Sequence, residues 1–230
     1  MKHIVLAALL LMSFNGIAQD NPKDLIRILN RKFNLVQDYT ADVSMKFDIP
    51  NVKMKNMNGR VFFKRPNKFR VKAKGIFFMP KQNPMQNIST LLLDTASYTT
   101  VISGYEVIDS RNCAIINIIP LKSESELILG KFWIDLADPL VRKSQITTKN
   151  NGTLESYSQY GDRSSYTLPD KITIKVEVNK FKVPKMMSVD LNKKAQEKKN
   201  LSQKEIGIIE MNFSQYKINT KLQDVVFVEE

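Results

Sequence analysis

The feature that most constrains the fold is a period-two alternation of apolar and polar residues that repeats along much of the chain. In the segment 41–49, apolar side chains stand at every odd position and polar or charged ones between them. Similar candidate strands lie at 59–63, 69–73, 113–119, 132–136, 144–148, 153–160, 172–178 and 207–213, and valine repeats once more at 225–226. Because successive side chains of a strand point to opposite faces, the pattern indicates roughly nine to eleven short strands, most of them half-buried.

Turn and helix signals organise these strands into one domain. Asn151-Gly152 is the strongest short hairpin signal in the sequence. Asn21-Pro22 is typical of a helix start, and helical spacing follows at Leu25, Ile28, Leu29, Phe33 and Val36. No strand–helix–strand rhythm appears, and no proline- or serine-rich linker divides the chain. We therefore predict an α+β, mainly β fold, with a curved antiparallel sheet and one preceding helix, as a single domain over residues 19–230.

The first 18 residues have the pattern of a secretory signal peptide. A short basic start precedes the apolar run 4–12, and small residues stand at Gly16 and Ala18. The apolar run is too short for a transmembrane helix, which needs about 20 residues. We predict a signal peptide over residues 1–18 and an exported, soluble mature chain. No cysteine lies at the cleavage point, so we expect no lipid anchor.

Histidine and cysteine are almost absent from the chain. The one histidine is His3, inside the predicted signal peptide, and the one cysteine is Cys113. Histidine-based triads, zinc sites and an internal disulfide are therefore excluded, and we predict no metal and no cofactor. Cys113 stands among apolar neighbours, which favours an inert buried thiol. The carboxylates of Asp135, Asp138 and Glu155 form no recognisable acid–base pattern, and we interpret them as surface residues.

The basic character of the chain does not predict nucleic-acid binding. Lysine and arginine number 35 against 23 acidic residues, a formal net charge of +12. The lysines are spread along the sequence rather than clustered beside aromatic residues, and export would keep the protein away from nucleic acid. The densest run, 193–204, has no apolar face and is interpreted as a solvated loop or short helix. Attraction to anionic lipid or to an acidic partner is the alternative.

The middle of the chain departs from the alternation. The stretch 75–93 contains two prolines, two methionines and the aromatic pair Phe77 and Phe78 before a short helical spacing that ends at Leu92. An irregular flap that contains Phe and Met suggests a cover over an apolar cavity, since thioether side chains adapt to irregular ligands. Ordinary core filling is the alternative. Phe78 is a candidate ligand-contacting residue in this flap.

The segment 58–70, NGRVFFKRPNKFR, resembles the signature hairpin of the LolA-type outer-membrane lipoprotein carriers. In that family a glycine-led strand runs into Lys-Arg-Pro-Asn, one variable residue and Phe. Asp38-Tyr39-Thr40-Ala41 after the first helix is similar to the family's opening. The segments 132–140 and 207–227 resemble its central strand and turn and its closing strands. The family's aspartate-glycine turn and aromatic strand are not plain in 75–105, and 181–206 looks like an insertion, so the chain resembles a divergent member.

The resemblance implies a fold, a function and partners. The family fold is an incomplete, open antiparallel β-barrel with helices forming a lid over an apolar cavity. Its members are monomeric periplasmic carriers, not enzymes. They accept acylated lipoproteins from an inner-membrane ABC transporter and shield the acyl chains. They then deliver the cargo to an outer-membrane acceptor, touching each membrane complex only transiently.

The resemblance also implies roles for individual residues. Arg65 matches the arginine that, in the family, bonds from the sheet to backbone carbonyls of the lid and holds the empty carrier closed. Phe69 matches an aromatic residue that is needed for acceptance or passage of cargo. By strand parity we expect Val61 and Phe63 to share the side of Arg65. Weaker candidates for the same wall are Val43, Met45 and Phe47.

Two other function classes stay open at this point. A lipid- or acyl-binding sensor or transport module of the same fold would not sort lipoproteins. Relatives with a sensor role usually carry a further domain, for which a mature chain of 19–230 leaves little room. An enzyme, for example a hydrolase with paired carboxylates, is the third class, and no arrangement of acidic residues in the sequence supports it.

Overall fold

The chain folds around a single antiparallel sheet of ten strands. In the computed structural model, the described residues are 21–50, 54–73, 92, 94–149, 152–177 and 206–228. The strand order is β3-β2-β1-β10-β9-β8-β7-β6-β5-β4, so β3 and β4 are edge strands and the barrel is not closed. The elements in chain order are α1 (Pro22–Asn34), β1 (Asp38–Asp48), β2 (Met57–Lys64), β3 (Lys68–Ala73), β4 (Tyr98–Ile108), β5 (Arg111–Pro120), β6 (Leu127–Asp135), β7 (Val141–Thr148), β8 (Gly152–Gln159), η1 (Ser164–Tyr166), β9 (Lys171–Glu177), β10 (Ile206–Ile218) and η4 (Asp224–Phe227).

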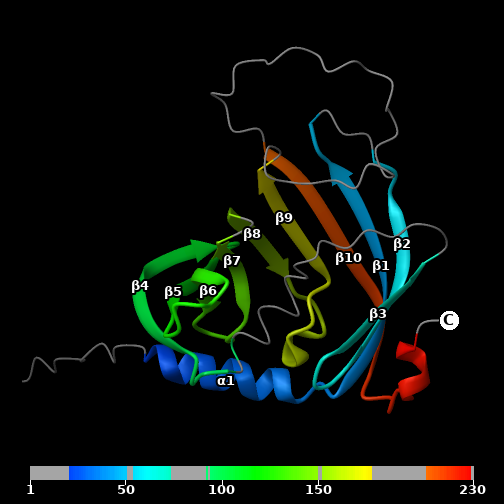
Figure 1. Cartoon of the computed structure of the whole chain (residues 1–230), viewed down its shortest axis with the longest axis horizontal. Helices are drawn as coiled ribbons and strands as arrows, with labels where there is room; N and C mark the ends of the chain where they lie inside the picture. The colour runs from blue at the N-terminus through cyan, green and yellow to red at the C-terminus, as the bar shows by residue number, and fades with distance from the viewer. Residues whose placement is uncertain are drawn as a thin grey trace, which may run out of the picture.

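The predicted fold class, a mainly β open antiparallel barrel, is confirmed. Figure 1 shows the sheet curving strongly, with α1 lying along one rim of it from β4–β6 toward the hairpin β2–β3. Within the described residues α1 is the α-helix of the fold, and no helix there is long and apolar enough to cross a membrane. The predicted signal peptide, 1–18, lies outside the described residues.

Helix α1 begins where the sequence predicts. Asn21 caps it, accepting a hydrogen bond from the Lys23 backbone N–H at 3.0 Å, and Pro22 occupies the first turn. The helix ends at Asn34, so the predicted extension to Val36 is wrong. Its buried face consists of Leu25, Ile26 and Leu29, with Ile26 more deeply buried than the expected Ile28.

The buried apolar side chains form two main clusters. The first, here called the helix-side cluster, joins α1 to β4–β7, and its members are Leu25, Ile26, Leu29, Leu92, Tyr98, Ala114, Ile116, Ile118, Phe132, Ile134, Val141 and Ile146. The second, here called the hairpin-side cluster, involves β1, β2, β9 and β10, and its buried members are Val36, Tyr39, Ala41, Val43, Met45, Ile49, Val61, Leu168, Ile172, Ile174, Val176, Ile209, Met211 and Phe213. The two clusters divide the sheet into a half that carries α1 and a half that carries the β2–β3 hairpin.

The strand predictions agree with the structure over most of the sheet, with two exceptions. The hairpin around Asn151-Gly152 is confirmed, since Thr148 pairs with Gly152, and Gly152 has a φ of 68°. Strand β4 was not predicted. It is an edge strand, and several of its apolar residues, such as Val107, face solvent, so its sequence lacks clean alternation.

The second exception is the C-terminal valine pair, which forms the 3₁₀ turn η4 and not a closing strand. Side chains from the β2–β3 hairpin hold this turn. The Lys64 ammonium donates to the Leu222 carbonyl at 2.8 Å, and Lys64 and Lys68 both pair with Asp224, at 2.6 and 2.8 Å. Their hydrogen bonds lower the pKa of Asp224 to about 2. These contacts hold the segment from Leu222 to Asp224 against the β2–β3 hairpin. The segment therefore does not add a strand to the sheet.

Cys113 is buried, as predicted. Its side chain is fully inaccessible and packs with Ile108 and Trp133 on the face of β5 that lies opposite the helix-side cluster. Burial raises the pKa of the thiol to about 11. The thiolate is the reactive form of cysteine. Cys113 is protected because little thiolate forms at neutral pH and because reagents cannot reach the buried sulfur.

We expect Cys113 to resist alkylation in the folded protein. At pH 8 iodoacetamide should leave the native thiol unmodified, because its pKa is about 11 and the side chain is inaccessible. The same reagent should label it fully in denaturant, where the pKa returns toward about 8.5. Intact-mass spectrometry measures both states. Rapid labelling of the native protein at pH 8 would contradict the observed burial.

Candidate functional site

Arg65 links the β2–β3 hairpin to the end of α1. Its Nε donates to the Val36 carbonyl at 2.7 Å, and its Nη2 donates to the Phe33 carbonyl. The Phe33 carbonyl lies in the last turn of α1, and the Val36 carbonyl lies two residues beyond the helix end, in the connection to β1. From the turn after β2, Arg65 therefore adds hydrogen bonds to this region, where the Phe33 carbonyl also accepts from the Val36 backbone N–H at 3.3 Å. This is the kind of contact that the family resemblance implies, and its role as a latch stays a prediction.

The register of the first strands explains why Arg65 reaches this point. Strand β1 begins four residues after α1 ends, and its first residue, Asp38, pairs with Lys64 at the end of β2. The turn that follows β2 must then lie beside the 35–37 connection. The Arg65 backbone N–H donates to the Gln37 carbonyl at 2.8 Å, which holds the turn there. Pro66 follows through a cis peptide bond, a geometry found mainly before proline in tight turns.

The electrostatics at this contact favour a positive charge. The carbonyl end of a helix carries a partial negative charge, so a cation is stabilised beside it. Partial burial lowers the pKa of Arg65 from its usual value. The guanidinium nevertheless stays charged at neutral pH, because arginine is not deprotonated in proteins. The contact is therefore a charge-assisted one, stronger than a bond between neutral groups.

The apolar candidates in the described residues fall in one place. Val43, Met45 and Val61 are buried members of the hairpin-side cluster, and Phe47, Phe63 and Phe69 pack against it half-buried. Three cross-strand pairs bring these side chains and their neighbours into rows: Phe63 with Phe69, Phe63 with Tyr39, and Met45 with Met57. The Phe63 and Tyr39 rings stack, with centroids 5.3 Å apart. Val61 and Phe63 thus face the same cluster, as their shared parity predicts.

The apolar wall formed by the hairpin-side cluster includes more residues than the sequence predicted. Strands β9 and β10 contribute Ile172, Ile174, Ile209, Met211 and Phe213 to the same cluster. Each of these residues stands in a predicted strand, but none was selected as a site residue. Met211 pairs with Met45, and Phe213 pairs with Val43, so these residues continue the rows directly. The signal that could have found them is their apolar alternation, once the closing strand is placed beside β1.

Aromatic and basic side chains gather at the Arg65 end of this wall. The Tyr39 ring lies 5.8 Å from that of Tyr216, whose hydroxyl donates to the Pro169 carbonyl at 2.8 Å. Burial raises the pKa of both tyrosines well above the usual value, so their hydroxyls stay neutral. The guanidinium of Arg163 lies 5.7 Å from the Tyr216 ring centroid. The wall is therefore apolar along its length and bordered by cationic groups at one end.

One candidate lies outside the described residues. It is Phe78, in the predicted flap 75–93, of which the described residues include only Leu92. Leu92 is fully buried in the helix-side cluster. Of the predicted insertion 181–206, residues 181–205 likewise lie outside the described residues.

The carboxylates considered for catalysis have separate structural partners. Asp135, expected at the surface, is buried, and it accepts hydrogen bonds from Arg142 Nη2 at 2.9 Å and from the Ala137 backbone N–H at 3.0 Å. Asp138 pairs with Lys32 of α1. Glu155 lies among Lys143, Lys175 and the hydroxyl of Tyr157.

These carboxylates therefore anchor local structure. The residues that the structure describes include no group of three or more acidic, histidine or cysteine side chains placed to hold a metal ion.

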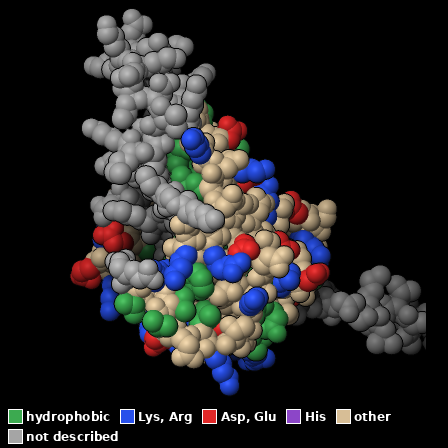
Figure 2. Space-filling view, turned by 90° about the vertical axis from the view of Figure 1, so that its right-hand side faces the viewer, with side chains coloured by type: hydrophobic (Ala, Val, Ile, Leu, Met, Phe, Trp, Pro, Cys, Tyr) green, Lys and Arg blue, Asp and Glu red, His purple; other side chains and the backbone are tan. Residues whose placement is uncertain are grey.

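The basic side chains on the β1–β3 side of the molecule are dispersed. On this face, Figure 2 shows Lys and Arg scattered among Asp and Glu and among small hydrophobic patches. Several are already paired, such as Arg60 with Asp42 at 2.6 Å. This described face shows no continuous basic stripe of the kind that follows a nucleic-acid backbone.

An unclosed, strongly curved antiparallel sheet with a helix along its rim defines the open-barrel class. Comparison with solved structures then specifies the fold. A DUF1329 family protein from Desulfovibrio piger has a TM-score of 0.55 at 12% identity, over 91% of this chain and 98% of that one. A LolA superfamily protein from Nitrosomonas europaea has a TM-score of 0.54 at 9% identity, over 90% and 97%. A domain described as an outer-membrane lipoprotein-sorting protein, from Vibrio parahaemolyticus, has a TM-score of 0.55 at 11% identity, over 90% and 97%.

The chain therefore has the LolA-like fold. No family model matches the sequence, and no curated protein matches it. At 9–12% identity the likeness concerns the fold, and function has to be argued from the chain's own residues.

Proposed function

We propose that this protein is a periplasmic carrier that binds the acyl chains of lipoproteins and moves them from the inner to the outer membrane. The observation that carries the proposal is the bond from Arg65 to the Phe33 and Val36 carbonyls, at the border of the hairpin-side cluster. That contact ties two parts of the molecule that a lid would have to separate. The LolA-like fold supports the same reading.

The chemistry that such a carrier needs is non-covalent. Each buried methylene group is worth about 0.8 kcal/mol, so an acylated protein does not leave a membrane for water at a useful rate. A wall of Met, Ile, Val and Phe side chains can shield the acyl chains, and methionine adapts to their changing shapes. No nucleotide or metal is required of the carrier itself. Release then depends on how readily the molecule returns to its closed state.

In this proposal Arg65 controls that return. In the closed state its guanidinium donates to the Phe33 carbonyl in the last turn of α1 and to the Val36 carbonyl just beyond it. Acyl chains that enter the hairpin-side cluster would separate the hairpin from α1 and break those bonds. Re-forming them favours expulsion of the cargo, so the energy needed for delivery is stored in the protein's own hydrogen bonds. The residues 19–230 would act as one domain after removal of the signal peptide.

Transfer of lipoproteins between membranes tests the proposal directly. The purified mature protein is incubated with spheroplasts of its own kind of cell, and the supernatant is probed for acylated lipoproteins. We expect release of lipoproteins in complex with the carrier, followed by their transfer to outer-membrane vesicles. An unrelated soluble protein of similar net charge serves as the control and should release no lipoprotein.

Binding of an apolar dye is the second measurement. The folded protein should bind the dye, and a triacylated peptide should displace it while the same peptide without acyl chains should not. Uptake of free lipid without release of any lipoprotein would contradict lipoprotein sorting and support the lipid-binding module instead. Absence of both dye binding and release would overturn an acyl-binding role altogether.

A further inference from the structure

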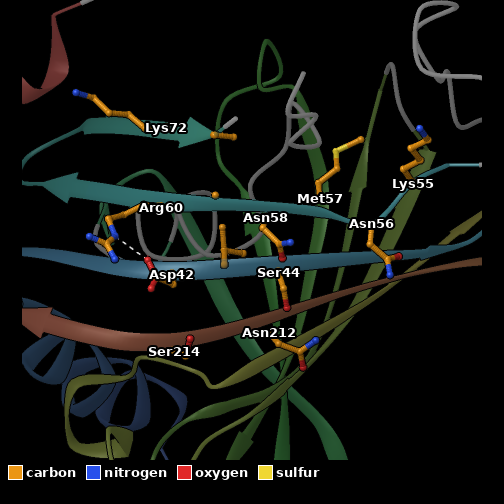
Figure 3. A pocket seen from close by; sticks show the side chains of 13 residues that line it. Asp42, Ser44, Lys55, Asn56, Met57, Asn58, Arg60, Lys72, Asn212 and Ser214 are labelled. Atoms are coloured by element: carbon orange, nitrogen blue, oxygen red, sulfur yellow. Dashed lines mark hydrogen bonds and ion pairs between the residues drawn. The ribbon is translucent and has the colours of Figure 1, made fainter. Parts of the chain in front are cut away.

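A pocket lies on the face of the hairpin half of the sheet that carries the even-numbered side chains of β1 and β2. It has a volume of about 1000 Å³ and is lined by strands β1, β2, β3 and β10 together with Lys55 and Asn56. Figure 3 shows Asn58, Ser44 and Asn212 following one another across three neighbouring strands. Its volume is at the upper end of the range for small-molecule sites, and amide, hydroxyl and charged side chains line it together with Val43, Met57 and Ala73.

Strand register explains the arrangement of these groups. Ser44 pairs with Asn58 on one side and with Asn212 on the other. In the next row Asp42 pairs with Arg60 and with Ser214. Their odd-numbered neighbours, such as Val43, face the hairpin-side cluster. Alternation therefore places a grid of polar side chains on the sheet face opposite the apolar wall.

The amides and hydroxyls of this grid are available to a ligand. Within the described part of the chain, the side chains of Asn58, Ser44 and Asn212 make no hydrogen bond. Each amide offers two donors and an acceptor, and the hydroxyl offers both functions. A row of groups that both donate and accept matches a ligand with several hydroxyl groups along its length.

The charges of the pocket are asymmetric. Lys55, Arg60 and Lys72 contribute three positive charges and Asp42 one negative charge, a formal balance of 3 − 1 = +2. Arg60 uses its Nε for Asp42, at 2.6 Å, which leaves the terminal nitrogens of the guanidinium for other partners. Lys72 lies 6.0 Å from the Phe62 ring and forms no ion pair with any described residue. An anionic group would be attracted to Lys72 and Arg60, while Asp42 could accept from hydroxyls.

We propose that this pocket binds an acidic saccharide, a chain of hydroxylated rings that carries carboxylate or phosphate groups. The hydroxyls bond to the row of Asn58, Ser44 and Asn212, and the anionic group lies toward Lys72 and Arg60. A free glycan and the head group of a glycolipid present the same chemistry. A simple anion would use the cations alone and leave the amide row unused.

Calorimetric titration tests the proposal with matched ligands. The probes are a soluble uronic-acid tetrasaccharide, its carboxyl-reduced neutral form and inorganic phosphate. We expect the acidic tetrasaccharide to bind most tightly and the neutral form more weakly. Neutral-lipid vesicles that display an acidic sugar head group form a further arm. Binding to the free sugar alone identifies a glycan, and binding to the vesicles as well identifies a lipid-borne source.

Two variants separate the contributions. The double substitution Asn58→Ala with Asn212→Ala should weaken both sugars by about tenfold, the loss of two hydrogen bonds between neutral groups. Lys72→Gln should weaken only the acidic sugar, by about fivefold, as expected for an exposed charge pair. Lys46→Gln is the matched control, because Lys46 is an exposed lysine on the same face of β1 and does not line the pocket.

Three results would overturn the proposal. The first is no binding of either sugar at millimolar concentration. The second is binding of inorganic phosphate as tight as that of the acidic sugar, because the amide row would then contribute nothing. The third is an equal loss in the Lys46→Gln control. Circular dichroism of each variant verifies that a loss of binding does not come from unfolding.

Discussion

Arg65→Leu is expected to raise the affinity of the protein for an apolar ligand and to prevent delivery of its cargo. The substitution removes the donors for the Phe33 and Val36 carbonyls, and hydrogen bonds to a charged group are worth about 1.5–3 kcal/mol each. Loss of the contact destabilises the closed state relative to the open one. A shift of about 3 kcal/mol would increase the open population on the order of a hundredfold, and the apparent affinity would rise in proportion.

Two measurements follow this effect. Dye titration gives the change in affinity, and the spheroplast assay with outer-membrane vesicles gives uptake and delivery separately. We expect uptake of lipoproteins to persist while delivery fails, because the leucine variant no longer gains the latch bonds on release. Hydrogen exchange should also be faster in the amides of residues 33–37.

Arg27→Leu is the matched control for this prediction. Arg27 is an exposed arginine of α1 whose partner is Asp24, at 3.0 Å, three residues away in the same helix. Its replacement makes the same change of charge and side chain far from the latch, and delivery should stay as in the wild type. A purely structural helix cap at Arg65 would lower stability in Arg65→Leu without changing dye affinity, and that result would contradict the latch.

Phe132→Ala is expected to have the largest effect on stability. Phe132 is fully buried in the helix-side cluster, where it pairs with Ile116 on β5 and Ser144 on β7. Truncation of a buried phenylalanine leaves a cavity and lowers the free energy of unfolding by about 3–5 kcal/mol. Since domains are stable by only about 5–15 kcal/mol, much of the total stability would be lost.

Urea unfolding followed by circular dichroism measures this loss. Phe62→Ala is the control, because Phe62 is only partly buried and lies near Lys72, outside both apolar clusters. Its truncation should lower the free energy of unfolding by less than half as much. Equal effects of the two substitutions would contradict the assignment of Phe132 to a tightly packed core.

The strands could be predicted wherever one of their faces is buried and the other is not. In β1 the odd positions from Tyr39 to Met45 are buried, and the alternation is visible in the sequence. Strand β4 escaped prediction because apolar residues such as Val101 and Val107 stay exposed, so the contrast between its polar and apolar faces is weak. The hydrophobic pattern thus predicts a strand only where one face of that strand is buried and the other is exposed.

The C-terminal valines show the opposite error. Val225 and Val226 have high strand propensity, but the turn η4 forms instead. Lys64, Lys68 and Arg70 hold the carbonyls and the carboxylate of this segment against the hairpin. Propensity is local, and these side-chain contacts come from residues about 156–160 positions away in the sequence.

The candidate site was predicted in part. Resemblance to a known hairpin selected Arg65 and Phe69, and parity placed Val61 and Phe63 on one face. What the sequence could not identify is the partner of Arg65, because the Phe33 and Val36 carbonyls belong to the backbone and leave no signature in side-chain identity. The contribution of β9 and β10 to the same wall was missed because the sequence does not show that β10 lies beside β1.

The sequence by itself determined the local features of this protein. They are the start of α1, the alternation that assigns each side chain to a face, and the Asn151-Gly152 hairpin. The tertiary structure alone decided which strands became neighbours. Strand β10 lies beside β1, so that Met45 pairs with Met211 more than 160 positions along the chain. Alternation depends on each strand's own backbone, whereas pairing between distant strands depends on how the whole chain buries its apolar surface at once.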